Sequence, residues 1–224
     1  MLDYKEEDIN GDGISDYVYL VGNRPYGSKS PFFSNLTLLI QEGNSGCITK
    51  IPLKENAGYT PTIFLGDFTG NRVSDVLVSI DSGGSGGYAF YYIYSYLKGV
   101  PKKIFDHNDF NQYSDYDVIY KNNYQVEVHS KDKSYIINIL YKGLDYLSDI
   151  YTDKGKLKEP IKGWVNPLGG LYPVDFKKNK IYELYATRRI AGRYNADNLG
   201  YVQTSLSWNG TEFTPFFQTV GILG

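Results

Sequence analysis

The sequence has 224 residues, a formal net charge of −2 and 42% hydrophobic residues, which is enough apolar material for a sizeable core. The absence of a long Lys/Arg run argues against a nucleic-acid surface. No apolar stretch reaches the roughly 18 residues that a membrane span needs, and Cys47 is alone, so an internal disulfide is excluded. The 23 tyrosines, together with many Gly, Ser and Thr, favour strands and turns over helices.

The first informative segment is "DINGDGISD" at residues 8–16, which alternates oxygen-bearing side chains with glycines. Calcium prefers six to eight oxygen ligands in a tightly curled loop, and glycine at the sixth position, Gly13, permits the turn. The predicted calcium ligands are the side chains of Asp8, Asn10, Asp12 and Asp16 and the backbone carbonyl of Ile14. The alternative is an Asx-rich turn that holds no ion.

The loop does not match an EF-hand. An EF-hand loop ends on a bidentate Glu at position 12 and leads into a helix. Here position 12 is Tyr19, and residues 16–22 are rich in β-branched and aromatic side chains, so we expect a loop between two strands.

Two later segments, 67–79 and 175–187, repeat the pattern: each begins with Asp, has an acid at position 9 after a turn, and continues as an apolar strand. A further segment, 117–130, keeps only the apolar strand. Arg72 and Lys180 stand at the sixth position of these loops, where the first loop has Gly13. A weaker second calcium site is predicted at Asp67, Thr69, Asn71, Val73 and Asp75. For the third loop we expect a metal-free turn, in which an ammonium stands between Asp175 and Glu183.

Predicted strands follow these loops in regular groups. In chain order they are residues 16–22, 35–43, 47–53, 60–68, 75–81, 87–97, 101–106, 124–130, 134–141, 181–190, 200–208 and 212–220. Four repeats, at roughly 1–57, 58–110, 111–165 and 166–224, are typical of propellers or solenoids. The sequence therefore predicts a single domain over 1–224, all-β and β-propeller-like, with about four four-stranded antiparallel blades.

The segments "DINGDGISD", "GDFTGNRVSD" and "VDFKKNKIYE" resemble the FG-GAP/VCBS repeat family, whose calcium-bearing blades also build integrin α-subunit propellers. Through "FLGDFTG", "SIDSGGSGG", "GLYPVDF" and "RRIAGRYNAD" the whole chain resembles predicted secreted VCBS-repeat proteins of Gram-positive bacteria. The resemblance implies a calcium-bearing propeller at an extracellular or cell-surface location, with a leader absent from this chain.

The loops at the opposite ends of the strands are the candidate ligand face. The predicted ligand-binding residues are Asp81, Tyr88, Arg188, Arg189, Arg193, Tyr194 and Asp197. Arginine forks suit carboxylates or phosphates, and loops on a rigid scaffold often carry function. The alternative is that the glycines make tight turns and the arginines pair with neighbouring acids.

Three functions compete. The first is a non-catalytic calcium-binding module, extracellular or on the cell surface, that binds a glycan, a cell-wall polymer or a protein. The second is a hydrolase or lyase acting on an anionic polysaccharide with Asp81 and Asp197, against which the missing nucleophile–base pattern weighs. The third is a purely structural surface or spore-associated protein. The sequence does not define the oligomeric state.

Overall fold

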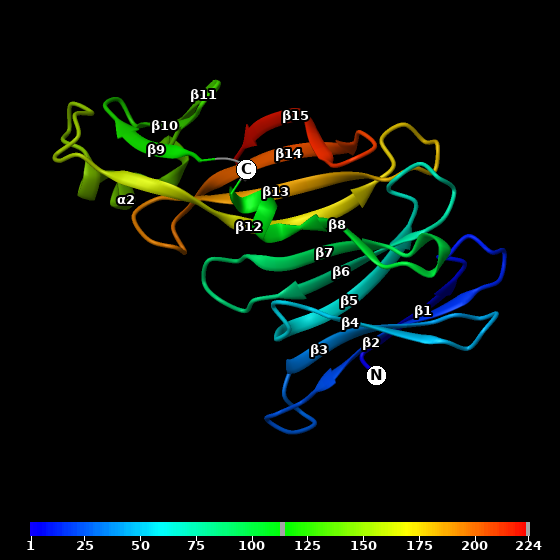
Figure 1. Cartoon of the computed structure of the whole chain (residues 1–224). Coiled ribbons are helices and arrows are strands. Elements are labelled where there is room, and N and C mark those ends of the chain that lie inside the picture. Colours follow the sequence, from blue (N-terminus) through cyan, green and yellow to red (C-terminus); the bar gives the residue numbers. More distant parts are fainter. Residues whose placement is uncertain (113–114, 223–224) are drawn as a thin grey trace.

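The computed structural model describes residues 1–112 and 115–222, which form two antiparallel sheets (Figure 1). The first sheet contains β1 (Asp3–Glu7), β2 (Asp16–Asn23), β3 (Phe32–Gln41), β4 (Ile48–Pro52), β5 (Gly58–Gly66), β6 (Asp75–Asp81), β7 (Ala89–Ser95) and β8 (Lys102–Asp106). The second contains β9 (Asp117–Lys121), β10 (Gln125–Ser130), β11 (Lys133–Asn138), β12 (Lys162–Val174), β13 (Glu183–Ala191), β14 (Asn198–Trp208) and β15 (Phe213–Gly221).

The described helices are short. They are η1 (Leu97–Gly99), α1 (His107–Gln112), η2 (Leu140–Lys142) and α2 (Leu144–Ile150). None of the helices within the described ranges is both long and apolar enough to cross a membrane. The strand predicted at 134–141 ends at Asn138 because the chain turns there into η2 and then α2.

Consecutive strands pair in four antiparallel meanders, which we number in chain order: β1–β4, β5–β8, β9–β11 and β12–β15. The first two are joined by pairing of β3 with β5 at Phe32–Tyr59 and Phe33–Gly58. The third and fourth are joined because the long strand β12 pairs with β9 at its start and with β13 along the rest. The prediction of an all-β, antiparallel fold is therefore confirmed.

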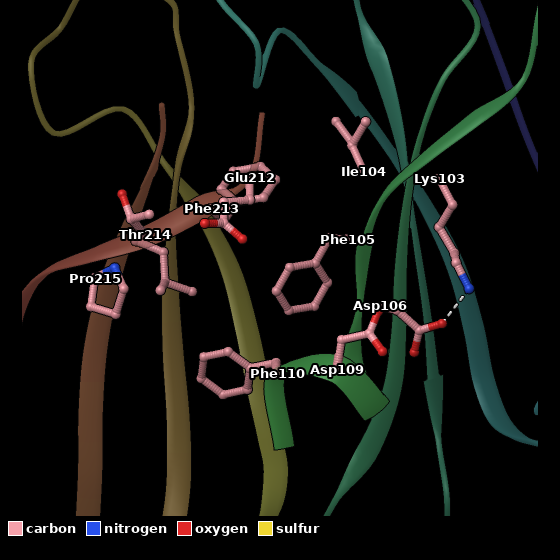
Figure 2. A pocket seen from close by; sticks show the side chains of 11 residues that line it. Lys103, Ile104, Phe105, Asp106, Asp109, Phe110, Glu212, Phe213, Thr214 and Pro215 are labelled. Atoms are coloured by element: carbon pink, nitrogen blue, oxygen red, sulfur yellow. Dashed lines mark hydrogen bonds and ion pairs between the residues drawn. The ribbon is translucent and has the colours of Figure 1, made fainter. Parts of the chain in front are cut away.

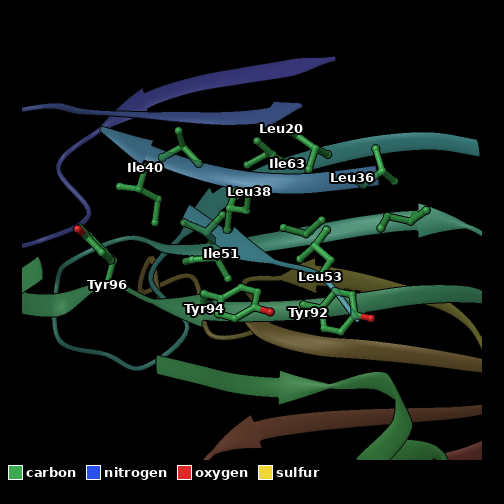
Figure 3. Close-up of a cluster of buried hydrophobic side chains, with 14 of the residues drawn as sticks. Leu20, Leu36, Leu38, Ile40, Ile51, Leu53, Ile63, Tyr92, Tyr94 and Tyr96 are labelled. Carbon is green, nitrogen blue, oxygen red and sulfur yellow. The ribbon is translucent and has the colours of Figure 1, made fainter. Parts of the chain in front are cut away.

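The hydrophobic core is divided into three clusters that define the stacking order. The first and second meanders share one cluster around Leu38 and Tyr92 (Figure 3). The second and fourth share another, which joins Leu77 to Leu184, and the third and fourth share a cluster that joins Val128 to Ile190. The spatial order is thus first, second, fourth, third, with the first and third meanders at opposite ends (Figure 1).

This order corrects the propeller expectation. A closed four-bladed propeller would place the meanders around an axis in chain order, whereas here the fourth lies between the second and the third. The structure supports an open stack of meanders, because β12 belongs to both meanders of the second sheet and carries the chain back beside the second meander. The third meander also has three strands of its own, not four.

The second meander is covered on both faces, which explains its nearly unbroken apolar sequence. In β6, Val76 and Val78 face the cluster shared with the first meander, while Leu77 faces the fourth meander. Successive side chains of a strand point to opposite faces, so a sheet buried on both sides needs apolar residues at every position.

The three Asp-initiated loops lie in a row at the right-hand end of the view in Figure 1. Ser74 of loop 67–75 donates a hydrogen bond through Oγ, at 2.8 Å, to Glu7, the last residue of β1 before loop 8–16. Loop 67–75 meets loop 175–183 where the Tyr182 N–H donates to the Asp67 carbonyl at 2.8 Å. The repeated loops are therefore a point of contact between meanders as well as a link between strands.

Candidate functional site

In the first predicted calcium loop, Asp8 closes the turn by accepting backbone hydrogen bonds. Its two carboxylate oxygens accept from the N–H of Gly11 at 2.7 Å and of Gly13 at 2.8 Å. Both glycines have positive φ, +83° and +86°, which glycine adopts without a Cβ penalty. The loop has the tight curl that its sequence predicts.

The next two predicted ligands also bond within the loop. Asn10 Oδ1 accepts from the Asp12 N–H at 2.8 Å, and Asp12 Oδ1 accepts from the Ile14 N–H at 2.8 Å. These are Asx turns, in which a short polar side chain takes a backbone donor two residues on. Ile14 itself is exposed.

Asp16 differs because it points into the protein and is completely buried. Its carboxylate accepts hydrogen bonds from the Ile9 N–H at 3.1 Å, the Asn10 amide at 3.2 Å and the Gly43 N–H at 3.0 Å. It thereby fastens the loop to the turn between β3 and β4. A buried carboxylate without such donors would be strongly destabilising.

The second loop repeats these contacts. Asp67 accepts from the Gly70 N–H at 2.6 Å and the Arg72 N–H at 2.8 Å, and the buried Asp75 accepts from the Phe68 N–H at 3.1 Å. Of the remaining predicted ligands, the Thr69 N–H donates to Asp67 at 3.1 Å and the Val73 N–H to the Asn71 side chain at 2.8 Å.

The third loop also keeps the arrangement. Asp175 accepts from the Lys180 N–H at 2.9 Å, and the buried Glu183 accepts from the Phe176 N–H at 3.1 Å. Lys177 places its ammonium 3.0 Å from Glu183, an ion pair of the kind that the sequence predicts here. Lys180 keeps the positive φ of the missing glycine, at +67°.

These contacts give the carboxylates a role that needs no ion. The third loop has the same shape although lysines stand at a ligand position and at the glycine position. Within residues 1–112 and 115–222, no group of three or more His, Cys, Asp or Glu side chains is close enough to share a metal ion. Calcium binding at 8–16 and 67–75 stays a prediction.

At the opposite end of the strands, the structure brings together the loops after β6 and β13. Arg189 donates to the Ser85 carbonyl at 2.9 Å and covers Gly87, where an added Cβ would lie 2.6 Å from its guanidinium. Tyr88 is 37% exposed in the same loop, and Asp81 ends β6 nearby. Ligand binding by this face stays a prediction.

Arg188 is a buried structural residue. Its side chain is enclosed between β12 and the segment that leads into β9, where Nε donates to the Asn166 carbonyl at 2.9 Å. Its guanidinium lies 5.4 Å from the ring centroid of Tyr116, and burial lowers the pKa of Arg188 below its usual range. A ligand would have to displace these contacts.

Asp197 is the centre of a second buried network. It is 2% exposed and accepts hydrogen bonds from Lys142 Nζ at 2.7 Å, Tyr146 OH at 2.6 Å and the Arg193 N–H at 2.9 Å. Burial alone would raise the pKa of Asp197, but these donors outweigh it and hold the pKa below its usual range.

The side chain of Arg193 packs beside this network. Its guanidinium lies 4.9 Å from the ring centroid of Tyr146 and 3.5 Å from an exposed carboxylate of Asp149. Tyr194 is 56% exposed in the same turn. Asp197 and Arg193 therefore hold α2 and η2 against the hairpin of β13 and β14.

A cavity lies elsewhere, between the edge strands of the two sheets. It has a volume of about 220 Å³ and is bounded by β8, α1 and the start of β15 (Figure 2). The lining residues are Lys103, Ile104, Phe105, Asp106, Asp109, Phe110, Leu206, Glu212, Phe213, Thr214 and Pro215. We call it the β8–β15 cleft.

Aromatic rings form the floor of the cleft. The Phe105 centroid lies 5.9 Å from both Phe110 and Phe213, and Phe213 lies 5.2 Å from Trp208. The rings come from three elements of two sheets, so the floor exists only when the meanders are stacked. Aromatic pairs at these distances are favourable beyond their simple burial.

The rim of the cleft is acidic. Asp109 and Glu212 are exposed, and Asp106 is buried and paired with Lys103. Burial alone would raise the pKa of Asp106, but the bonds from Lys103 and the Asn108 N–H outweigh it and lower the pKa. Asp109 and Glu212 are left with no ion-pair partner in the described part of the chain.

Contacts behind the rim hold α1 in place. His107 is buried, with Nδ1 3.6 Å from Asp106 and Nε2 3.6 Å from Glu55, and burial lowers its pKa. On the other side, Asn111 accepts a hydrogen bond from the Leu168 N–H of β12 at 2.8 Å. The cleft is therefore supported by both sheets.

Sequence reasoning missed this cleft. Its two halves, 103–110 and 206–215, are about a hundred residues apart, and neither carries a recognisable spacing of chemical groups. The only local signal is an acid next to a Phe in each half, at Asp109–Phe110 and Glu212–Phe213.

The fold and its sites define a class of all-β proteins built from stacked antiparallel meanders with acid-capped loops. The model of the YybI C-terminal domain family matches residues 114–221. Over 219 residues the chain is 49% identical to the uncharacterized protein YybI of Bacillus subtilis (strain 168), covering 97% of this chain and 83% of that protein. The chain belongs to the YybI family. No solved structure matches it.

These matches correct the resemblance to the FG-GAP/VCBS family, which is wrong. The matching family model is that of the YybI C-terminal domain, and no FG-GAP or VCBS repeat family matches the chain. The three Asp-initiated segments resemble FG-GAP/VCBS repeats because the same alternation of acids, amides and turn residues also closes a hydrogen-bonded loop between strands. The matched region, residues 114–221, includes every strand of the second sheet and none of the first.

Replacing Asp16 with Ala should lower the free energy of unfolding by about 3 kcal/mol, because the N–H groups of Ile9 and Gly43 lose their acceptor. The matched control, Asp12→Ala, removes an exposed acceptor and should cost less than about 1 kcal/mol. Urea denaturation of both variants in EGTA gives the comparison. Equal costs would contradict the capping role of Asp16.

The shape of the loops should not depend on calcium, because the lysine-bearing third loop has the same hydrogen bonds. We expect the far-UV circular dichroism spectrum to be the same in millimolar calcium and in EGTA, and a different spectrum would contradict loops closed by their own hydrogen bonds. A rise of the melting temperature in calcium that Asp12→Ala abolishes would support the predicted calcium site, because an ion bound to the folded state stabilises it, and calorimetric titration would give its affinity.

Asp197→Asn should cost roughly 3 kcal/mol of unfolding free energy at pH 7, because it leaves Lys142 without its buried partner. The pKa of Asp197 is lowered in the folded state, so its stabilisation is full above the ordinary Asp value of about 3.9 and is lost as pH falls through the lowered pKa. The difference between wild type and variant should therefore shrink between about pH 5 and pH 2. Asp149→Asn, which alters an exposed pair, should cost about 0.5 kcal/mol or less.

Proposed function

We propose that this protein is a non-catalytic binding module whose ligand site is the β8–β15 cleft. The observation that carries the proposal is the combination of an aromatic floor with the exposed carboxylates of Asp109 and Glu212, which lack ion-pair partners in the described ranges. Such a surface suits a cation attached to an apolar body, since the carboxylates attract the charge and the rings cover the rest.

The structure offers less support to the loop face at Arg188 and Asp197. Both residues are buried and hydrogen-bonded within the fold. The same burial weakens the alternative of a hydrolase or lyase that uses Asp81 and Asp197. Binding of a glycan or cell-wall polymer there, an extracellular or cell-surface location and a bound calcium ion stay predictions.

The test uses 2-phenylethylamine, an aromatic ring with an ammonium, and phenylacetate as the matched anion. Trp208 contacts the floor, so its fluorescence reports on the cleft, and a Trp164→Phe background leaves it as the only tryptophan. We expect the amine to bind with a dissociation constant in the millimolar range, typical of so small a ligand, and phenylacetate not to bind.

Removal of the two rim charges tests whether they bind the amine, and an exposed Asp elsewhere serves as the control. The double variant Asp109→Asn, Glu212→Gln should weaken binding of the amine about tenfold, equivalent to about 1.4 kcal/mol. The variant Asp132→Asn, in the exposed turn between β10 and β11, should leave it unchanged. Binding of both probes with equal strength, or no effect of the rim variant, would contradict the proposed site.

A further inference from the structure

The size of the β8–β15 cleft limits what it holds. Pockets that enclose whole drug-sized ligands usually measure about 300–1,000 Å³, whereas this cleft measures about 220 Å³. It suits one protruding group better than a complete ligand. In protein interfaces, such small, well-packed pockets typically receive a single anchoring side chain of the partner.

The charges and aromatic rings of the cleft determine which partner side chain it can bind. Asp109 and Glu212 supply negative charge, while the positive charge of Lys103 is already paired with Asp106. The three phenylalanines supply flat faces. An arginine guanidinium forms two-point bonds with carboxylates and also stacks on aromatic rings, whereas a lysine ammonium stays strongly hydrated.

The strand beside the cleft offers a place for the rest of the partner. Within the described residues, β15 pairs only with β14, and β8 pairs only with β7, so each is an edge of its sheet. An exposed strand edge presents backbone groups to which an extended peptide can add. Phe216 and Phe217 follow in β15 and are 54% and 55% exposed.

We propose that the cleft receives an arginine side chain of a partner protein, whose backbone lies extended along the first half of β15. This rests on the proposed function, because it names the ligand class of the same cleft. Pro215 has no N–H, so the added strand pairs over only a few residues and the arginine supplies much of the specificity.

The experiment compares three blocked peptides, acetyl-Thr-Val-X-Val-Thr-amide, in which X is arginine, lysine or citrulline. Citrulline has nearly the shape of arginine without its charge. We expect the arginine peptide to bind about tenfold more tightly than the citrulline peptide and at least threefold more tightly than the lysine peptide. In the Asp109→Asn, Glu212→Gln variant the preference for arginine should disappear, whereas Asp132→Asn should keep it.

A fourth peptide tests the backbone. N-methylation of the two amides that flank arginine removes donors needed for strand pairing, so binding should weaken about tenfold. Unchanged binding would overturn the placement along β15. If 2-phenylethylamine binds but the arginine and citrulline peptides bind equally, the arginine proposal fails and the proposed function stands. If neither the amine nor any peptide binds, both fail.

Sedimentation velocity separates a partner protein from a second copy of this chain. A monomer over the concentrations used for binding supports a separate partner. A dimer that the double rim variant dissociates would show that the cleft is filled by another copy and would overturn the assignment to a different protein.

Discussion

A buried acid at the ninth position of each repeated loop is the contact on which the architecture depends. Asp16, Asp75 and Glu183 each accept the N–H of the loop's second residue and each begin or directly precede a central strand. The hydrogen bond sets where the strand starts, and in the first two loops the apolar second residue lies in the core, whereas Phe176 of the third loop is 47% exposed. Ile9 and Phe68 are completely buried. Separate hydrogen bonds, Ser74 to Glu7 and Tyr182 to Asp67, join these loop regions and so link the first, second and fourth meanders.

The local features of this fold were readable from the sequence. Strands such as 75–81 and 16–22 follow from β-branched and aromatic residues next to Gly and Asp turns, and the structure places β6 at Asp75–Asp81 and β2 at Asp16–Asn23. The loops were located correctly as well, because their hydrogen bonds join residues within nine positions of one another. What their side chains bind was not readable, since a capped turn and a calcium loop ask for the same residue types.

The stacking order and the cleft could not be predicted, because both depend on contacts between distant segments. Nothing near Leu184 indicates that it packs on Leu77 and not on the third meander. The burial of the charged residues on the predicted ligand face could not be predicted either. Arg188 lies in β13 and Asp197 in the turn after it, and Tyr116, Lys142 and Tyr146 from other parts of the chain cover them. No sequence pattern marks Asp109 and Glu212 as binding residues, although both are exposed in the structure.

The sharing of β12 between two meanders has a consequence for biosynthesis. The apolar face of the third meander, with Val118, Val126 and Val128, is covered by Ile190, Leu199 and Val202. A ribosome delivers the third meander first and its cover only after residues 190–202 have left the exit tunnel. Until then the α2 residues Leu147 and Ile150 share this cluster without its later members, so part of the apolar face is exposed to water, a state in which nascent chains are prone to aggregate. The cluster between the first two meanders has no such delay, since both meanders have emerged by residue 106, although the other face of the second meander also waits for the fourth.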